Sequence, residues 1–200
     1  MNEINNLKNK KIEKEILLQL TNNKVFITVW RLIKTKNHNL IIKSLKKIYD
    51  TIDKKFKYII IGDWPEKKHI KQLIKKLWLE NNIILLWIQK NVFKYINASE
   101  YFLFWSSIEW FPNVLGEAIA CNKPIITSNF ETWSQEIILW EYKNSFKWPH
   151  PHYGPNGVLI DLNNFESNLI EVYKNLDKLT QKQTVLDKFI NTDFINTLFY

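Results

Sequence analysis

Short runs of apolar residues, many of them β-branched or aromatic, alternate along the chain with segments in which apolar residues return at helical spacing. The apolar runs lie at 25–29, 58–61, 83–86, 101–104, 124–127 and 158–160. The helical patterns between them cover 39–49, 66–77, 92–97 and 113–122. Runs that are apolar at every position are typical of strands buried on both faces, and strands that alternate with helices are typical of parallel sheets. The pattern therefore predicts an α/β fold with a single doubly wound parallel sheet.

The same pattern sets the limits of the predicted domain. Residues 1–24 are polar apart from an amphipathic stretch at 12–20, which indicates a linker and a leading helix. Residues 25–162 carry all the predicted strands, and 163–200 become wholly helical, at 165–178 and 184–200, which indicates C-terminal helices packing on the domain. The segment 149–157 is rich in turn residues and is expected to be a loop. Ligands of such sheets bind outside the carboxyl ends of the strands.

Composition narrows the class of partner. The 200 residues carry a formal net charge of +8, but the lysines are scattered over the predicted helices and no arginine block or aromatic groove suggests nucleic acid. A basic surface suits a phosphorylated ligand or an anionic membrane, although a biased base composition of the gene would also explain the many Lys, Asn and Ile residues. The single Cys121 excludes an internal disulfide and favours the cytoplasm. Since no apolar run reaches the roughly 18 residues of a membrane span, we expect at most a peripheral contact with the inner membrane face.

The most informative stretch follows the predicted strand 101–104. Glu109 falls in the loop after that strand, Pro112 suits the first turn of a helix, and Glu117 lies one turn inside that helix. Both carboxylates are thus expected at the ligand-binding edge of the sheet. The unpaired backbone N–H groups expected at the start of the helix would face the same space and form a site for phosphate. These N–H groups belong to Asn113, Val114 and Leu115.

A second polar group follows the first predicted strand, in V-F-I-T-V-W-R-L-I-K-T-K-N-H. Arg31 offers a planar fork that can hold two phosphate oxygens, and Lys36 offers a point charge. An Arg and a Lys after a strand are more often surface charges when they stand alone. Together with Glu109 and Glu117 they indicate a site for an anionic ligand.

These stretches resemble the retaining glycosyltransferases of family 4, whose GT-B fold pairs two Rossmann-like domains. The family has E-G-F-x-x-x-x-x-E-A where this chain has E-W-F-P-N-V-L-G-E-A, and G-R-L-x-x-x-K-G where it has W-R-L-I-K-T-K-N. Y-I-I-I-G-D-W-P-E is similar to the V-G-D-G-P-E turn of the family, and N-I-I-L-L-W-I-Q-K-N is similar to the strand and loop that face the nucleobase. Four matches in the family's order over residues 25 to about 140 are far more specific than any one of them.

The resemblance implies a role for each matched residue. Glu109 would contact hydroxyls of the donor sugar, and Glu117 would accept hydrogen bonds from the two ribose hydroxyls. Arg31 and Lys36 would clamp the diphosphate, and Ile88 would pack on the base. Residues 25–162 would thus be the nucleotide-sugar-binding, Rossmann-like half of the enzyme. It would take a UDP-sugar or a similar donor and transfer a hexose-type sugar with retention, without metal or cofactor.

The acceptor half of such an enzyme is not found in the sequence. The resemblance implies that a separate chain supplies it, or that this chain is a fragment of a split or wrongly bounded gene. Acceptors in the family are often lipid-linked or polysaccharide. A non-catalytic nucleotide-sugar-binding module is the alternative. A dinucleotide-binding oxidoreductase is a weaker one, because no G-x-G-x-x-G opens the first helix. The sequence does not decide the sugar, the base, the acceptor or the oligomeric state.

Tryptophan is unusually common and glycine unusually rare, at 9 and 4 residues. Trp30, Trp64, Trp87 and Trp110 occupy positions at which the family has glycine, and Trp78, Trp133 and Trp140 fall at expected turns or helix ends. One hypothesis is that the source reads UGA as glycine and that UGA was translated as tryptophan here. The other is a tryptophan-rich surface that anchors at a membrane interface.

Other polar residues give weaker evidence of a functional site. His150 and His152 lie close together, but two histidines without a Cys or carboxylate partner make a weak metal site. No D-x-D motif follows a strand. Ser106 and Ser107 lack the His and Asp that would make either a nucleophile.

Overall fold

The computed structural model of the chain describes residues 2–63, 65–107, 109, 112–130, 134–139 and 150–179. Seven strands form one sheet in the order β3-β2-β1-β4-β5-β7-β6. Their bounds are β1 Lys24–Val29, β2 Phe56–Ile61, β3 Ile83–Leu86, β4 Tyr101–Phe104, β5 Ile125–Ser128, β6 His152–Gly154 and β7 Gly157–Ile160. All neighbours pair in parallel except β6 and β7. The doubly wound sheet is thereby confirmed, and each of the six predicted strands ends within two residues of its predicted limits.

The edge strand β6 corrects the expectation of a loop at 149–157. It pairs with β7 in a short antiparallel hairpin in which Gly154 lies opposite Gly157. The turn residues Pro155 and Asn156 connect the two strands. A strand of three residues is too short to show an alternating pattern, which is why the turn residues dominated the prediction.

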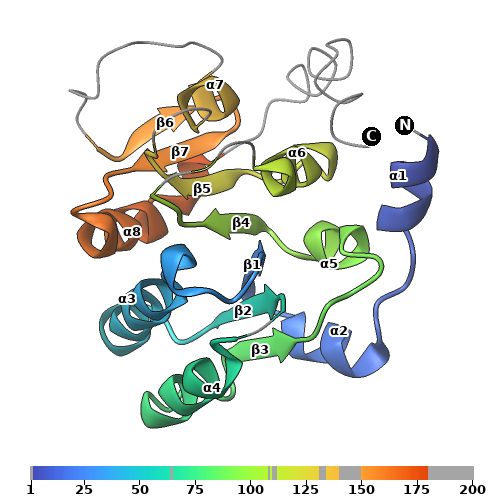
Figure 1. The fold of residues 1–200 in the computed structure, drawn as a ribbon, viewed down its shortest axis with the longest axis horizontal. Helices are drawn as coiled ribbons and strands as arrows, with labels where there is room; N and C mark the ends of the chain where they lie inside the picture. The colour runs from blue at the N-terminus through green and yellow to red at the C-terminus, as the bar shows by residue number, and fades with distance from the viewer. Residues whose placement is uncertain are drawn as a thin grey trace.

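The helices cover both faces of the sheet. They are α1 Asn2–Lys8, α2 Lys14–Leu20, α3 His38–Thr51, α4 Lys67–Lys76, α5 Phe93–Ala98, α6 Asn113–Ala120, α7 Ser134–Leu139 and α8 Phe165–Lys174, with short 3₁₀ turns η1 Lys34–Lys36 and η2 Leu176–Lys178. α3, α4 and α8 lie on one face, and α5 and α6 lie on the other (Figure 1). α1 and α7 are additions to the predicted set, and the helix expected at 184–200 lies outside the described residues.

The core forms two layers because consecutive strand residues point to opposite faces. In β1, Ile27 joins the layer under α5 and α6, and Phe26 joins the layer under α3, α4 and α8. Both side chains are fully buried. An apolar run without polar interruptions is thus what a strand between two helical layers requires.

The segment 2–24 packs on the same domain. α1 lies against α5, and the amide of Asn91 donates to the carbonyl of Leu7 at 2.8 Å. Glu13, just before α2, accepts hydrogen bonds from Lys94 at 2.6 Å and from the hydroxyl of Tyr95 at 2.9 Å. The predicted leading helix is therefore joined to the body of the domain by its own contacts.

α8 lies on the opposite face of the sheet and reaches the amino ends of β1 and β2 (Figure 1). Asp53 precedes β2 and accepts hydrogen bonds from Lys24 at 2.7 Å and from the hydroxyl of Tyr173 at 2.9 Å. The ammonium of Lys24 also lies 4.8 Å from the centre of the Tyr173 ring. We call these three residues the amino-edge cluster.

Candidate functional site

The candidate site lies where the order of the strands reverses. β1 leads to β2 on one side, whereas β4, its other neighbour, leads to β5 on the far side. Because the loops after β1 and β4 leave in opposite directions, a crevice opens outside the carboxyl ends of these two strands. The loop after β1 carries Arg31 and Lys36, and the loop after β4 carries Glu109. The topology places these three residues at one edge of the sheet.

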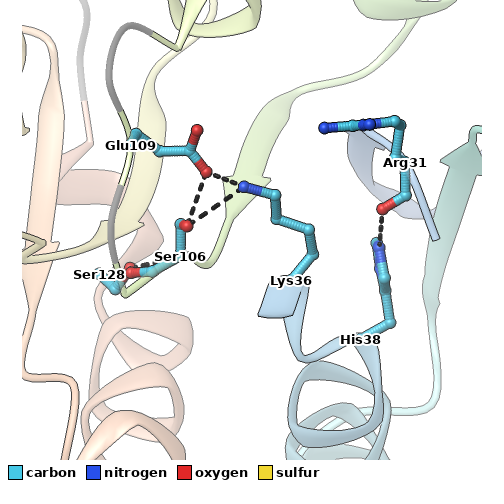
Figure 2. A network of polar contacts seen from close by, with 6 residues as sticks. All are labelled: Arg31, Lys36, His38, Ser106, Glu109 and Ser128. Atoms are coloured by element: carbon cyan, nitrogen blue, oxygen red, sulfur yellow. Dashed lines mark hydrogen bonds and ion pairs between the residues drawn. The ribbon is translucent and has the colours of Figure 1, made fainter. Parts of the chain in front are cut away.

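Lys36 and Glu109 meet across this crevice in a buried ion pair (Figure 2). Their exposed fractions are 7% and 8%. The ammonium also lies 4.6 Å from the centre of the Trp30 ring, and the hydroxyl of Ser106 donates to Glu109 at 2.6 Å. Two charges at this depth are tolerated because each has the other and further polar or aromatic contacts. We call Lys36, Glu109, Ser106 and Trp30 the carboxyl-edge cluster.

The backbone of Arg31 is fixed by a hydrogen bond, whereas its side chain is exposed. The ring nitrogen Nε2 of His38, the first residue of α3, lies 3.3 Å from the carbonyl oxygen of Arg31 (Figure 2). Burial lowers the pKa of His38 to about 4, so the ring is neutral at neutral pH and the nitrogen that faces the carbonyl carries the proton. No ion pair to the guanidinium of Arg31 occurs within the described residues. Its charge is available to a ligand.

A cavity of about 550 Å³ opens beside the cluster, at the ends of β1, β2 and β3 and the start of α6. Five of the predicted site residues line it: Arg31, Ile88, Asn113, Val114 and Glu117. Ile88 is 52% exposed, so an apolar surface is open to the cavity. The volume falls in the range of pockets that hold small ligands.

Glu117 is the unusual member of this lining. Its carboxylate makes no hydrogen bond or ion pair with the described residues. Burial raises the pKa of this carboxyl group above the ordinary value of 4.5. A partly desolvated carboxylate without a donor is costly, because nothing replaces the water it has lost. The side chain is therefore suited to a ligand that brings its own hydrogen-bond donors.

The first turn of α6 offers fewer free N–H groups than the sequence suggested. Asn113 and Val114 line the cavity, as expected of an anion site at a helix N-terminus. Leu115 differs, because its N–H donates to the carbonyl of Pro112 at 2.8 Å and its side chain is buried in the core. The expectation for Leu115 was wrong, since the turn that starts the helix already uses its amide.

Trp30 connects the cavity to the carboxyl-edge cluster. It lines the cavity, and its ring contacts the ammonium of Lys36. Gly62, at the end of β2, lies directly beside it: a Cβ on Gly62 would come within 1.9 Å of the carbonyl oxygen of Trp30. Only glycine allows this close approach, which brings the loops after β1 and β2 together at the cavity.

Sequence reasoning missed the part played by Ser106. It was considered only as a nucleophile, whereas the structure places its hydroxyl between Lys36 and Glu109. The signal for this was its place three residues before Glu109, on the same loop after a buried strand. Its neighbour Ser107 is exposed.

Within the described residues, no group of three or more His, Cys, Asp or Glu side chains is arranged to hold a metal ion. His150 and His152 lie at the hairpin of β6 and β7, where a ring nitrogen of His150 is 3.4 Å from the carbonyl of Leu159. None of the helices in the described part of the chain combines the length and the apolar character of a membrane span.

Comparison with known proteins gives a family and a set of relatives. The family model described as glycosyl transferases group 1 matches residues 9–167. An uncharacterized glycosyltransferase of Methanocaldococcus jannaschii is 35% identical over 192 residues, which cover 91% of this chain and 47% of that protein. The N-acetylgalactosamine-N,N'-diacetylbacillosaminyl-diphospho-undecaprenol 4-alpha-N-acetylgalactosaminyltransferase of Campylobacter jejuni is 34% identical over 114 residues, 57% of this chain and 30% of that protein. The chain spans less than half the length of either relative.

Solved structures share the fold. The crystal structure of Anabaena HepE in complex with UDP superposes with a TM-score of 0.69 at 22% identity, covering 96% of this chain and 54% of that one. WaaG, a glycosyltransferase involved in lipopolysaccharide biosynthesis, gives 0.70 at 15% identity, covering 96% of this chain and 50% of that one. At these identities the likeness shows the fold, which is that of one Rossmann-like half of a GT-B protein.

Proposed function

This chain belongs to the glycosyl transferases group 1 family, and on that premise we propose that it is the donor-binding half of a retaining glycosyltransferase of family 4. The observation that carries the proposal is the carboxylate of Glu117, which is desolvated and has no partner within the described residues, in a cavity that also contains Arg31 and the start of α6. A ribose brings two hydroxyl donors for that carboxylate, and a diphosphate brings the negative charge that Arg31 and the helix N-terminus require. HepE was crystallised with UDP and, in a second structure, with UDP-glucose, which supports a nucleotide sugar as the ligand.

Each part of the donor has a proposed contact. The base packs on Ile88, the ribose hydroxyls donate to Glu117, and the diphosphate lies between Arg31, Lys36 and the N–H groups of Asn113 and Val114. The sugar reaches Glu109, across Trp30 from the cavity.

The proposed chemistry uses charge rather than a metal ion. When the sugar leaves the donor, negative charge develops on the departing nucleoside diphosphate. Cations and helix N–H groups that are already in place stabilise this charge, because they need not reorganise as the bond breaks. Arg31 and Lys36 would supply the cations, and Glu109 would hold the hydroxyls of the sugar while it is transferred with retention.

The acceptor half is proposed to come from another polypeptide or from a longer form of this one, since the chain spans less than half of the relatives compared above. The relative from Campylobacter acts on a diphospho-undecaprenol-linked substrate by its name, which supports a lipid-linked acceptor. A binding module without transfer is the second candidate. Release of UDP from a UDP-sugar only after an acceptor-domain chain is added would favour the enzyme.

Binding of UDP to the chain with Glu117→Ala tests the proposal. Affinity is expected to fall by about 1–3 kcal/mol, because the ribose hydroxyls lose their acceptor. Thermal stability should not fall, since the change removes a carboxylate whose burial raises its pKa. Glu171→Ala on the exposed side of α8 is the matched control and should bind UDP as the original chain does. An unchanged affinity in the Glu117 variant would remove the ribose assignment.

We further propose that tryptophan stands for glycine at several positions. Trp78 supports this, because its φ of +57° lies in the left-handed region that glycine adopts most readily. The indole nitrogen of Trp30 also supports it, since that nitrogen is buried without a hydrogen-bond partner. Trp64, Trp110, Trp133 and Trp140 lie outside the described residues. Peptide mass spectrometry of the protein from its source decides the matter, and tryptophan found at positions 64 and 110 would end the hypothesis.

Peripheral contact with an anionic membrane on the cytoplasmic side is a further proposal. α4 presents the exposed lysines Lys68, Lys71 and Lys75, which suit an anionic surface. Co-sedimentation with vesicles that contain anionic lipid, and not with neutral vesicles, is the expected result. If the chain sediments with neither kind of vesicle, the proposal is removed.

A further inference from the structure

Ser106 contacts both members of the buried ion pair through one hydroxyl group. Its Oγ donates to Oε1 of Glu109 at 2.6 Å and accepts from Nζ of Lys36 at 3.4 Å. The serine is 1% exposed, so water does not compete for these bonds. A hydroxyl carries one hydrogen, and Ser106 donates it to Glu109, so the lone pairs of the hydroxyl oxygen remain to accept a hydrogen bond from Lys36. The hydroxyl therefore orients the carboxylate and the ammonium together.

The backbone of Ser106 is itself fixed to the next strand. Its N–H donates to Oγ of Ser128 at 2.9 Å, and the same Oγ donates to its carbonyl oxygen at 2.7 Å (Figure 2). Ser128 is the last residue of β5 and is fully buried. One side chain thus satisfies both backbone groups of Ser106 and fixes the loop after β4 to the neighbouring strand. The sheet, through Ser128 of β5, therefore fixes the position of the Ser106 hydroxyl.

We propose that Ser106 is a positioning residue that keeps Glu109 in place for the donor sugar when Lys36 turns to the diphosphate. The proposal rests on the proposed function. In the structure Lys36 is bonded to Glu109, and the same ammonium is required by the negative charge of the diphosphate. As a phosphate draws Lys36 away, Glu109 loses its countercharge. The bond from Ser106 remains and helps to hold the carboxylate, because Ser128 fixes Ser106 independently of Lys36.

Ser106→Ala tests this, and Ser107→Ala is its matched control, since the neighbouring serine is exposed and the change of atoms is identical. Affinities for UDP-glucose, UDP and UMP are measured by calorimetry on the full chain. We expect Ser106→Ala to bind UDP-glucose about tenfold more weakly, as is typical of one lost hydrogen bond to a charged group. UMP, which reaches neither Glu109 nor the second phosphate position, should bind within about twofold of the original chain. Ser107→Ala should leave all three affinities unchanged.

The pattern across the ligands separates positioning from a merely structural role. An equal loss for UDP-glucose and UMP would mean that the whole site is distorted and would overturn the proposal. Unchanged affinity for UDP-glucose would overturn it as well. Ser106→Thr keeps the hydroxyl, and recovery of UDP-glucose binding in that variant supports the proposal.

Failure of the proposed function has a different signature. If the original chain binds none of the three nucleotides, the donor site is wrong whatever the variants do. The crystal structures of Lys36→Met and of Lys36→Met with Ser106→Ala, both without ligand, then decide the role of the serine, because Lys36 holds Glu109 in neither. A Glu109 carboxylate that is displaced only in the double variant supports positioning by Ser106, and a carboxylate in the same place in both variants overturns it.

Discussion

The two ends of β1 carry clusters of nearly the same chemistry. At the amino edge Lys24 pairs with Asp53, and at the carboxyl edge Lys36 pairs with Glu109. In each cluster a hydroxyl group donates to the carboxylate and an aromatic ring lies under the ammonium. The clusters differ in burial, because the side chains of Lys24 and Asp53 are 43% and 22% exposed, against 8% and 9% for Lys36 and Glu109.

The difference in burial indicates a difference in purpose. Tyr173 of the amino-edge cluster belongs to α8, so that cluster fastens a helix to the sheet. Burying a salt bridge contributes little net stability compared with apolar residues of the same size. The carboxyl-edge cluster is therefore poorly explained by stability alone. Its place beside a cavity lined by Arg31 and Glu117 favours a role in binding.

Removing one lysine from each cluster should give the largest contrast. Lys36→Met is expected to lower the free energy of unfolding by about 3–5 kcal/mol, because Glu109 keeps a buried charge without its partner. Lys24→Met should cost about 1 kcal/mol or less, because water can solvate Asp53. Urea denaturation measures both. Adding Glu109→Gln to Lys36→Met should restore part of the loss, and equal losses for the two single variants would contradict the comparison.

Lowering the pH should affect the two edges in separate windows. The pKa of His38 is about 4 against an ordinary 6.5, because burial disfavours the charged ring, and the nearby charge of Lys36 adds to this. The unfolded chain therefore takes up a proton first, and stability falls as the pH drops from 6.5 towards 4. The hydrogen bond from Lys24 lowers the pKa of Asp53 to about 2 against an ordinary 3.8. The contribution of Asp53 to stability is therefore lost as the pH falls from 3.8 towards 2, below the range of His38.

Two variants test which residue causes the loss of stability in each pH range. His38→Gln keeps an amide donor for the carbonyl of Arg31 but cannot titrate, so it should lose less stability between pH 6.5 and 4 than the original chain. The difference should reach a few kcal/mol at most. Asp53→Asn should leave this upper window unchanged and reduce the loss of stability in the lower one, to which Glu13, with a pKa also lowered to about 2, contributes as well. Stability of the original chain that stays level down to pH 4 would show that His38 is not buried in solution.

The sequence predicted the sheet better than it predicted the contacts at its edge. Apolar runs such as 101–104 reveal a buried strand because burial on both faces leaves no place for a polar side chain. Arg31, Lys36, Glu109 and Glu117 could be assigned to one edge because the ends of parallel strands meet there. The bonds of Ser106 to Glu109 and Ser128 could not be predicted, since they depend on the paths of two loops and on a residue 22 positions away.

The last contrast concerns two helix ends at the amino edge of the sheet, opposite the cavity. α4 and α6 end in the same motif. After α4, Leu79 N–H donates to the carbonyl of Ile74 at 3.1 Å, and Trp78 lies between them with a φ of +57°. After α6, Lys123 N–H donates to the carbonyl of Ala118 at 3.0 Å, and Asn122 has a φ of +56°. Asparagine tolerates this left-handed conformation, whereas tryptophan gains nothing there to offset its strain.

Glycine at the two positions should therefore have unequal effects. Trp78→Gly is expected to raise the free energy of unfolding by about 1 kcal/mol, because the strain of the left-handed conformation disappears. Little packing is lost, since Trp78 is 80% exposed. Asn122→Gly should change stability by less than about 0.5 kcal/mol. Thermal melts would show a rise of about 2–4 °C for the first variant, with UDP affinity unchanged in both because neither residue lines the cavity. A loss of stability in Trp78→Gly would mean that the indole makes contacts worth more than the strain, and would count against glycine as the residue that this turn requires.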